Sequence, residues 1–381
     1  GIAVVLADQA AIFVDGRYTL QVRQQVDVAA FVPHHLMDDP PTHWIASHLG
    51  KKRLGYDPWL NTPTSVERFE KACGEAGGTL VACDDNPLDA VWPDRPAPPN
   101  APAVAYPADY AGETSSAKRG RVAQVLSDSK VDAVVLTAPD SIAWLLNIRG
   151  GDLDYTPVTL SFAMLHTDAR VDWFVDLDKV DDSLRAHLGN EVIVMPPGEL
   201  GPALSFLGAH KRRVQIDPAS TANWIATTLH DAGAEVSRAA DPCTLPKACK
   251  NEVEVAGMRA AHVRDGAALT RFLAWLPTAV AAGGVTEITA ADHLEAIRRE
   301  DEQLTGLSFP TIGGAGPNGA IVHYRAMPET TRMLTEGELF LVDSGGQYRD
   351  GTTDVTRTVA IGTPNDEQRD RFTRVLKGHI A

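Results

Sequence analysis

The sequence contains few cysteines, and none is placed for a zinc cluster. Only four occur in 381 residues: Cys73, Cys83, Cys243 and Cys249. No two of them have Cys-x-x-Cys spacing, and no histidine is placed to complete a set of zinc ligands. Thiols this sparse in so long a chain are typical of a reducing compartment. The sequence therefore favours a cytoplasmic protein.

Long apolar runs and positive charge are also scarce. No stretch approaches the roughly 18 apolar residues of a membrane span. The first residues, Gly1–Leu6, lack the basic segment and cleavage site of a signal peptide. Lys and Arg number 35 against 50 Asp and Glu, which gives a net charge of −15. Because such a chain offers little counter-charge to phosphates, we expect neither nucleic acid nor a membrane as its partner.

A tandem repeat organises the first two thirds of the chain. Each copy begins with a predicted strand pair, residues 3–6 with 11–14 and residues 162–166 with 171–175. Three matched positions lie 160 or 161 residues apart: Asp8 and Asp168, Asp15 and Asp176, and the pairs Asp57-Pro58 and Asp217-Pro218. A shared offset of this kind predicts two related α/β domains. We expect each Asp-Pro pair to end a strand and begin a helix, with Asp as the N-cap.

The repeat and a later change of pattern predict three domains. Residues 1–110 form the first, including a proline-rich linker at 86–109. Residues 111–248 form the second. About fifty residues at its front have no counterpart in the first, which we expect to lack its N-terminal part. Residues 249–381 form an α+β domain that ends on an uncapped helix, as the first half of a larger domain would. The predicted fold class is therefore α/β and α+β.

The stretch Leu339–Ala360 has the pattern of a β-hairpin, with two β-prone runs joined by a loop rich in Gly and Asp. If Gly346 and Gly351 close the loop, Asp343 lies directly opposite Asp354. Cross-strand Cβ atoms are about 4.5–5.5 Å apart, and two carboxylates at that distance repel unless a cation lies between them. A pair of divalent ions about 3.5–4 Å apart would suit this spacing. Two solvated acids beside a turn would also fit.

His323 is the second candidate functional residue. It follows three apolar residues in a short predicted strand, 320–324, after the glycine-rich loop 313–319. This loop lacks the Lys-Ser/Thr of a phosphate-binding loop and matches no dinucleotide fingerprint, so we expect a backbone turn there. At this point three roles remain open for the histidine: a buried core residue, a hydrogen-bond donor to a substrate carbonyl or oxyanion, and a metal ligand.

Several stretches closely resemble the Xaa-Pro aminopeptidases (aminopeptidase P), in particular the three-domain form. The strongest likeness lies in residues 309–324, FPTIGGAGPNGAIVHY, and residues 341–358, LVDSGGQYRDGTTDVTRT. The run Phe372–Ile380 shares it. The two N-terminal domains resemble that family's creatinase-like pair, and Asn147-Ile-Arg149-Gly150 is part of this likeness. The resemblance covers essentially the whole chain.

This resemblance implies a pita-bread catalytic domain that holds two divalent ions, usually manganese. Such enzymes release the N-terminal residue from peptides with proline in second position, through a hydroxide shared by the two ions. Asp343 and Asp354 match two of the family's five metal ligands, and His323 matches a substrate-binding histidine that steadies the carbonyl oxygen during catalysis. The other ligands, one His and two Glu, would lie beyond residue 381, as would two further active-site histidines. A homodimer is also implied.

With only part of the site, residues 1–381 alone are expected to be inactive. A prolidase that cuts Xaa-Pro dipeptides, or a creatinase, is the nearest alternative. The two N-terminal domains and the loop Gln347–Gly351 favour the aminopeptidase. A non-catalytic binding protein on the same scaffold is a further alternative, and the presence of both Asp343 and Asp354 argues against it.

Overall fold

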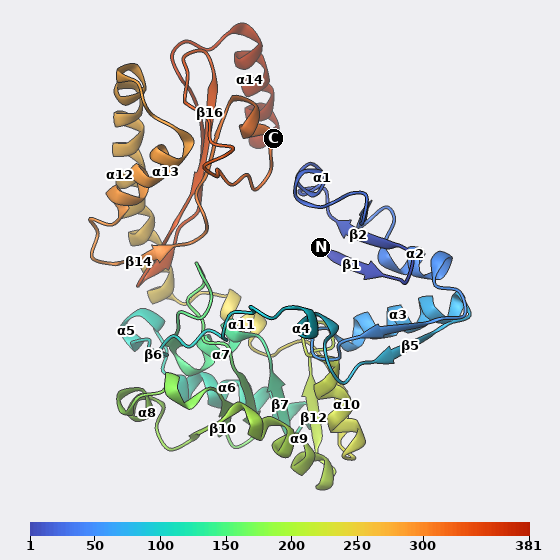
Figure 1. The fold of residues 1–381 in the computed structure, drawn as a ribbon. Helices are drawn as coiled ribbons and strands as arrows, with labels where there is room; N and C mark the ends of the chain where they lie inside the picture. The colour runs from blue at the N-terminus through green and yellow to red at the C-terminus, as the bar shows by residue number, and fades with distance from the viewer. The chain divides into compact units, whose positions relative to one another are not determined.

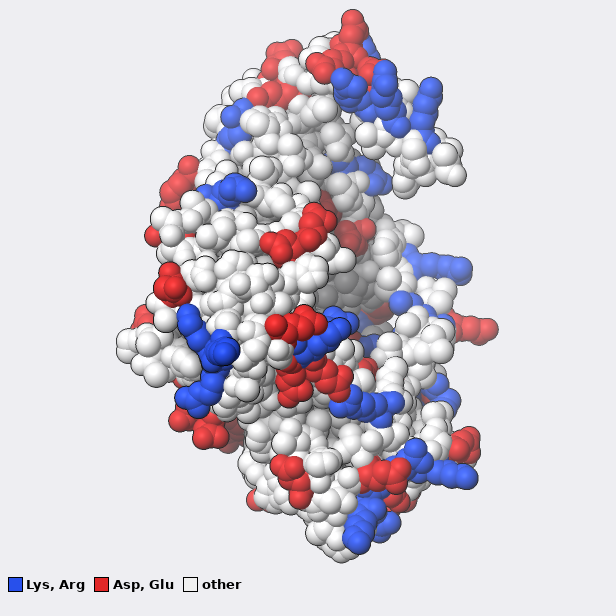
Figure 2. Space-filling view, turned by 90° about the vertical axis from the view of Figure 1, so that its right-hand side faces the viewer, with Lys and Arg blue, Asp and Glu red and all other residues white.

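The computed structural model describes residues 1–381, which form two compact units (Figure 1). The first unit comprises residues 1–15 and 25–251, and the second comprises residues 16–24 and 252–381. On the face shown in Figure 2, acidic and basic side chains are interspersed among uncharged ones. None of the helices is both long and apolar enough to span a membrane.

The larger part of the first unit is built on a six-stranded mixed sheet with the order β11-β10-β9-β7-β12-β13. β7 lies near its middle, antiparallel to β9 and parallel to β12. The strands are β7 (Ala133–Leu136), β9 (Phe162–His166), β10 (Val171–Phe174), β11 (Val192–Met195), β12 (Arg213–Ile216) and β13 (Glu235–Arg238). The helices around them are α6 (Ser115–Asp128), α7 (Pro139–Leu146), α8 (Asp182–Leu188), α9 (Leu200–Ala209), α10 (Asn223–Asp231) and α11 (Thr244–Ala248).

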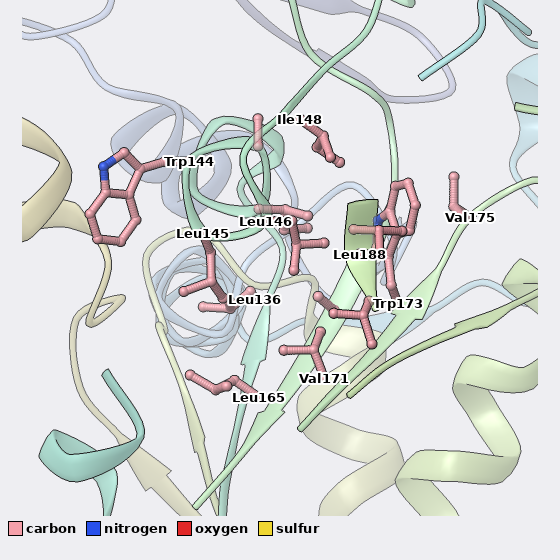
Figure 3. Close-up of a cluster of buried hydrophobic side chains, with 14 of the residues drawn as sticks. Leu136, Trp144, Leu145, Leu146, Ile148, Leu165, Val171, Trp173, Val175 and Leu188 are labelled. Atoms are coloured by element: carbon pink, nitrogen blue, oxygen red, sulfur yellow. The ribbon is translucent and has the colours of Figure 1, made fainter. Parts of the chain in front are cut away.

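Both faces of this sheet are buried, because alternate residues of each strand point to opposite faces. On one face Leu136, Leu165 and Trp173 pack with side chains of α6, α7 and α8 (Figure 3). On the other face Met164 and Phe174 pack with α9 and α10. The central strand β7 is buried along its whole length. These two layers of helices enclose the main core of the first unit.

The smaller part of the first unit repeats the same order without a counterpart of β7. β1 pairs antiparallel with β2, β2 pairs parallel with β3, and β4 pairs parallel with β5. In the second copy β7 joins the matching groups of strands into one sheet, whereas here they remain two separate sheets. The elements are β1 (Ile2–Val5), β2 (Ala10–Val14), β3 (Val32–His35), α2 (Pro41–His48), β4 (Arg53–Tyr56), α3 (Pro63–Glu75) and β5 (Thr79–Ala82).

The Asp-Pro pairs do not have the predicted capping role. The helices after them begin at Pro63 and Asn223, several residues later. Asp57 and Asp217 instead accept hydrogen bonds from backbone N–H groups two residues further on. This is an Asx turn, for which Asp is well suited because its short carboxylate reaches its own backbone. The prediction of a helix start at these positions is therefore wrong, although the two copies are alike.

These two turns also join the copies to each other. The Thr64 N–H donates to the Pro218 carbonyl oxygen, and the Trp224 N–H donates to the Pro58 carbonyl oxygen. Each partner in one bond has its counterpart 160 residues away in the other, so the two contacts are related by the repeat. The rings of Trp59 and Trp224 stack beside them, with centroids 4.2 Å apart. The tandem domains therefore pack as one unit.

Segments between and after these domains complete the first unit. Within the predicted linker, α4 (Pro87–Val91) is followed by an extended stretch to residue 103. β6 (Val104–Ala105) then pairs with β8 (Ile148–Arg149) from the second copy, and α5 (Ala108–Ala111) leads into α6.

The second unit consists of two long helices against small antiparallel sheets. α12 and α13 lie on one side of the sheet β15-β16-β19 (Figure 1), and Phe272, Leu294 and Phe340 are among the side chains buried between them. No residue of the last helix, α14, is buried. The elements are α12 (Glu252–Ala282), α13 (Glu287–Arg298), β14 (Leu304–Leu307), β15 (Ile312–Ala315), β16 (Leu339–Ser344), β17 (Gly346–Tyr348), β18 (Gly351–Thr352), β19 (Val355–Ala360) and α14 (Asp366–Ile380).

Candidate metal and substrate site

The hairpin that carries Asp343 and Asp354 forms, but its register differs from the predicted one. Asp343 on β16 pairs with Thr356 on β19. The turn lies at Arg349 and Asp350, because Tyr348 and Gly351 are already paired. Asp354 is therefore two residues away from the predicted position opposite Asp343. A two-residue connection is the tightest common hairpin loop, and it sets the register of both strands.

Contacts with the two long helices fix this turn. The Arg264 guanidinium of α12 forms an ion pair with Asp350, which therefore does not hydrogen-bond its own loop as predicted. The Tyr348 hydroxyl donates to Asp265, and Arg298 of α13 donates to both oxygens of the same carboxylate. All three side chains are buried. Burial, followed by the charge of Asp265, raises the pKa of Tyr348, so its hydroxyl remains a donor.

A glycine opposite Asp354 allows the strands to approach closely. β16 and β17 are separated by Gly345, and β18 and β19 are separated by Thr353 and Asp354. A Cβ atom at Gly345 would overlap with the Thr353 carbonyl oxygen and the Ser308 hydroxyl. That hydroxyl donates to the Thr353 carbonyl, and the Ser308 N–H donates to the Gly345 carbonyl. The close approach at this break depends on residue 345 having no side chain.

Asp343 and Asp354 are close despite the register shift. Burial raises the pKa of the Asp343 carboxyl, and the charge of Asp354 and a hydrogen bond between the two side chains raise it further. A hydrogen bond with the Thr356 side chain and the proximity of His323 act in the opposite direction on the same pKa. The structure therefore brings together all three residues that the sequence predicted for the site.

One oxygen of this pair is suited to a cation. Asp343 Oδ1 is buried and has no hydrogen-bond partner within the chain. A buried carboxylate oxygen without a donor is unfavourable unless a positive charge neutralises it, and carboxylate oxygens are ligands for divalent ions. No group of three or more His, Cys, Asp or Glu side chains is gathered for metal binding within residues 1–381. Asp343 and Asp354 thus fit a metal ion as two ligands of a larger set.

His323 lies in a loop and not in the predicted strand. A 3-10 helix, η3 (Gly316–Ala320), follows β15, and His323 has a left-handed backbone with φ of 56°. Non-glycine residues adopt this conformation uncommonly, and neighbouring contacts must hold it. The side chain is exposed. This excludes the role of a buried core residue.

The Glu287 side chain anchors the loop that bears His323. Glu287 begins α13 and is fully buried. Its carboxylate has four hydrogen-bond donors, all from the segment that runs from β15 past the histidine. They are the Ala315 N–H, the Asn318 amide, the Tyr324 hydroxyl and the Arg332 N–H. Because Tyr324 directly follows His323, the network fixes one side of the histidine.

Tyr18 and Gln21 were not predicted as site residues. The Tyr18 hydroxyl lies 3.0 Å from His323 Nδ1, and the Gln21 amide donates to the carbonyl oxygens of Val322 and His323. The sequence predicted a helix from about residue 17 to 26 here, whereas α1 spans only Gln21–Gln25. More than 300 residues separate these partners in sequence, and no local pattern links them.

The polar stretch Asn147–Arg149 is structural. Asn147 is buried with a left-handed backbone, and its amide oxygen accepts from the Lys118 ammonium. The Arg149 guanidinium lies over the Tyr106 ring, 3.7 Å from its centroid. A cavity of about 600 Å³ in the same unit is lined by residues that include Thr114, Arg119 and His187. It contains none of the predicted site residues.

Comparisons with known proteins agree with this architecture. Residues 94–254 match the creatinase/prolidase N-terminal domain, and residues 256–381 match metallopeptidase family M24. A probable Xaa-Pro aminopeptidase P of Aspergillus niger is 37% identical over 393 residues, which cover 100% of this chain and 64% of the relative. One from Talaromyces marneffei is 36% identical over 100% of this chain and 60% of its own length. The chain thus spans less than two thirds of these curated relatives.

A solved structure extends this likeness to three dimensions. An X-prolyl aminopeptidase from Caenorhabditis elegans matches with a TM-score of 0.88 and 32% identity over 95% of this chain and 60% of that chain. It is described as a cytosolic enzyme with a di-nuclear active site. An Xaa-Pro dipeptidase from Bacillus anthracis, at 19% identity and a TM-score of 0.56, covers 70% of this chain and 71% of its own and shares the fold alone. These findings confirm the predicted resemblance and fold class.

Proposed function

Because the chain belongs to metallopeptidase family M24, we propose that the full-length protein is an Xaa-Pro aminopeptidase. It would release the N-terminal residue from peptides whose second residue is proline. The observation that carries this proposal is the convergence of Asp343, Asp354 and His323 at one place in the M24 region. The similarity to probable Xaa-Pro aminopeptidases over the whole chain supports it.

We assign Asp343 and Asp354 to holding two divalent ions, with manganese as the metal that the family resemblance implies. The unpartnered buried oxygen of Asp343 supports this assignment. When bound, such ions polarise a carbonyl oxygen and lower the pKa of water. The resemblance places the remaining ligands, one His and two Glu, after residue 381. We therefore propose that residues 1–381 alone are inactive.

His323 is proposed to bind substrate and to take part in catalysis. Its exposed imidazole lies beside the Asp343 carboxylate, so it can reach the carbonyl oxygen of a peptide bound at these acids. A hydrogen bond from the ring to that oxygen becomes stronger as negative charge builds up on it during attack by water. The Glu287 network supports this role because it fixes the loop before the substrate arrives.

The remaining proposals concern partners and location. We propose that the protein acts as a homodimer in the cytoplasm on peptides with an N-terminal Xaa-Pro sequence. The sparse cysteines and the likeness to a nematode enzyme described as cytosolic support the location. The dimer follows from the family resemblance.

The test compares an Xaa-Pro tripeptide with an Xaa-Pro dipeptide as substrates of the full-length protein loaded with manganese. We expect the tripeptide to be cleaved after its first residue. Asp354→Asn should lower kcat/KM by more than about 100-fold and reduce bound metal, since loss even of a group that supports a ligand costs 10–100-fold. Asp350→Asn is the matched control, because this acid lies in the same hairpin and pairs with Arg264.

Three outcomes would contradict the proposal. Normal turnover by Asp354→Asn would remove the metal assignment. A preference for the dipeptide would indicate a prolidase. Full metal loading without cleavage of either peptide would indicate a non-catalytic binding protein.

A further inference from the structure

We propose that Tyr18 is a positioning residue that selects the tautomer of His323. The inference rests on the proposed function, in which the histidine donates a hydrogen bond to the substrate. The Tyr18 hydroxyl lies 3.0 Å from His323 Nδ1, and the two rings are in edge contact with centroids 5.7 Å apart. Both the polar contact and the ring contact thus act on the same imidazole.

The segment that carries Tyr18 belongs to the same compact unit as the histidine. Residues 16–24 pack with residues 252–381, whereas the residues before and after them belong to the first unit. The Gln21 amide donates to the carbonyl oxygens of Val322 and His323, at 3.1 and 3.3 Å. It therefore holds the backbone at the position with the left-handed φ of 56°. The segment contacts the backbone of the histidine through one side chain and its ring through another.

The hydroxyl can determine which ring nitrogen carries the proton. In a neutral imidazole one nitrogen donates and the other accepts. A tyrosine hydroxyl with a pKa near 10 keeps its proton at neutral pH and can donate it to Nδ1. The imidazole proton then resides on Nε2, which faces away from Tyr18 and can donate to a substrate oxygen. In the opposite tautomer Nε2 would present a lone pair and would repel that oxygen.

The other groups on the loop support this arrangement without replacing it. The Glu287 network acts through Tyr324 and the backbone and makes no contact with the imidazole. Arg17 lies near the face of the Tyr18 ring, with Cζ 5.8 Å from the centroid. A cation there favours the placement of the ring. The hydroxyl of Tyr18 is thus the group that can orient the imidazole proton.

The first measurement reads the tautomer directly and does not require activity. The full-length protein is labelled with 15N-histidine and studied at about pH 8.5, about two units above the ordinary pKa of histidine. His323→Gln identifies the signals of this ring. We expect a protonated Nε2 in the wild type and a mixture of tautomers in Tyr18→Phe. A protonated Nδ1 in the wild type, or the same tautomer in both proteins, would overturn the proposal.

The second measurement is a double-mutant cycle on the Xaa-Pro tripeptide. Tyr18→Phe should lower kcat about tenfold, as loss of one hydrogen bond would, with little change in KM and with unchanged bound metal. In the His323→Gln background the same change should have no further effect. An equal loss in both backgrounds would show a merely structural role for Tyr18. Leu20→Ala is the matched control, since this exposed side chain lies in the same segment.

The two proposals can fail separately. If the wild-type protein cleaves no Xaa-Pro peptide, the proposed function fails, and the 15N signals still decide whether Tyr18 sets the tautomer. If cleavage is normal and Tyr18→Phe changes neither the signals nor kcat, only the assignment of Tyr18 fails.

Discussion

Asp343 lies directly opposite Thr356 on the neighbouring strand, and the two side chains are hydrogen-bonded. Asp354 is therefore a diagonal neighbour of Asp343. Diagonal pairs in a regular ladder are about 7–8 Å apart. The ladder is interrupted at Thr353 and Asp354, and there the second carboxyl approaches the first. The candidate metal site thus depends on an interruption of the hairpin as well as on its two acids.

The hydrogen bond from Thr356 should matter for metal binding. Thr356→Val removes a group that orients the Asp343 carboxylate and favours its charged form. We expect metal affinity in the full-length protein to fall about 10–100-fold, as for other groups that support a metal ligand. Competition with a chelator of known affinity measures this. Thr358→Val is the control, since Thr358 lies on the same face of β19 opposite Leu341. Equal effects of the two changes would contradict the prediction.

Gly345 should not tolerate a side chain. Gly345→Ala would force a Cβ atom against the Thr353 carbonyl oxygen, so we expect the free energy of unfolding to fall by about 1–3 kcal/mol. Gly266→Ala is the matched control, because nothing lies within 4 Å of the added atom and the position is inside α12. It should stabilise the helix by about 0.5–1 kcal/mol. Urea unfolding measures both changes, and an unaffected midpoint for Gly345→Ala would refute the prediction.

Glu287→Gln should loosen the loop that bears His323. The amide of Gln replaces an accepting oxygen with a donor, which then faces donors of the loop, and we expect a loss of about 1–3 kcal/mol in unfolding free energy. Hydrogen exchange of residues 316–332 should become faster. Glu295→Gln, also on α13, removes only a surface ion pair with Arg299 and is the control. If exchange in the loop is unchanged, the carboxylate does not anchor it.

Much of the architecture was accessible from local patterns. The repeat offset predicted two similar domains, and β1 with β2 and β9 with β10 form the predicted strand pairs. The strand pairs are encoded by alternating apolar residues, which are local. The capping role of Asp57 and Asp217 was wrong because Asp stabilises an Asx turn and a helix start through the same short-range chemistry. Composition alone does not choose between these two structures.

The sequence by itself determined that Asp343 and Asp354 belong to one hairpin and that both resemble metal ligands. Only the tertiary structure decided the register. A shift of two residues keeps every side chain on its own face, so an alternating pattern cannot detect it. The contacts of Tyr348 and Asp350 with α12 fix it instead. Likewise, the contact of Tyr18 with His323 arises because folding brings together residues 305 positions apart, a separation over which the sequence carries no local signal.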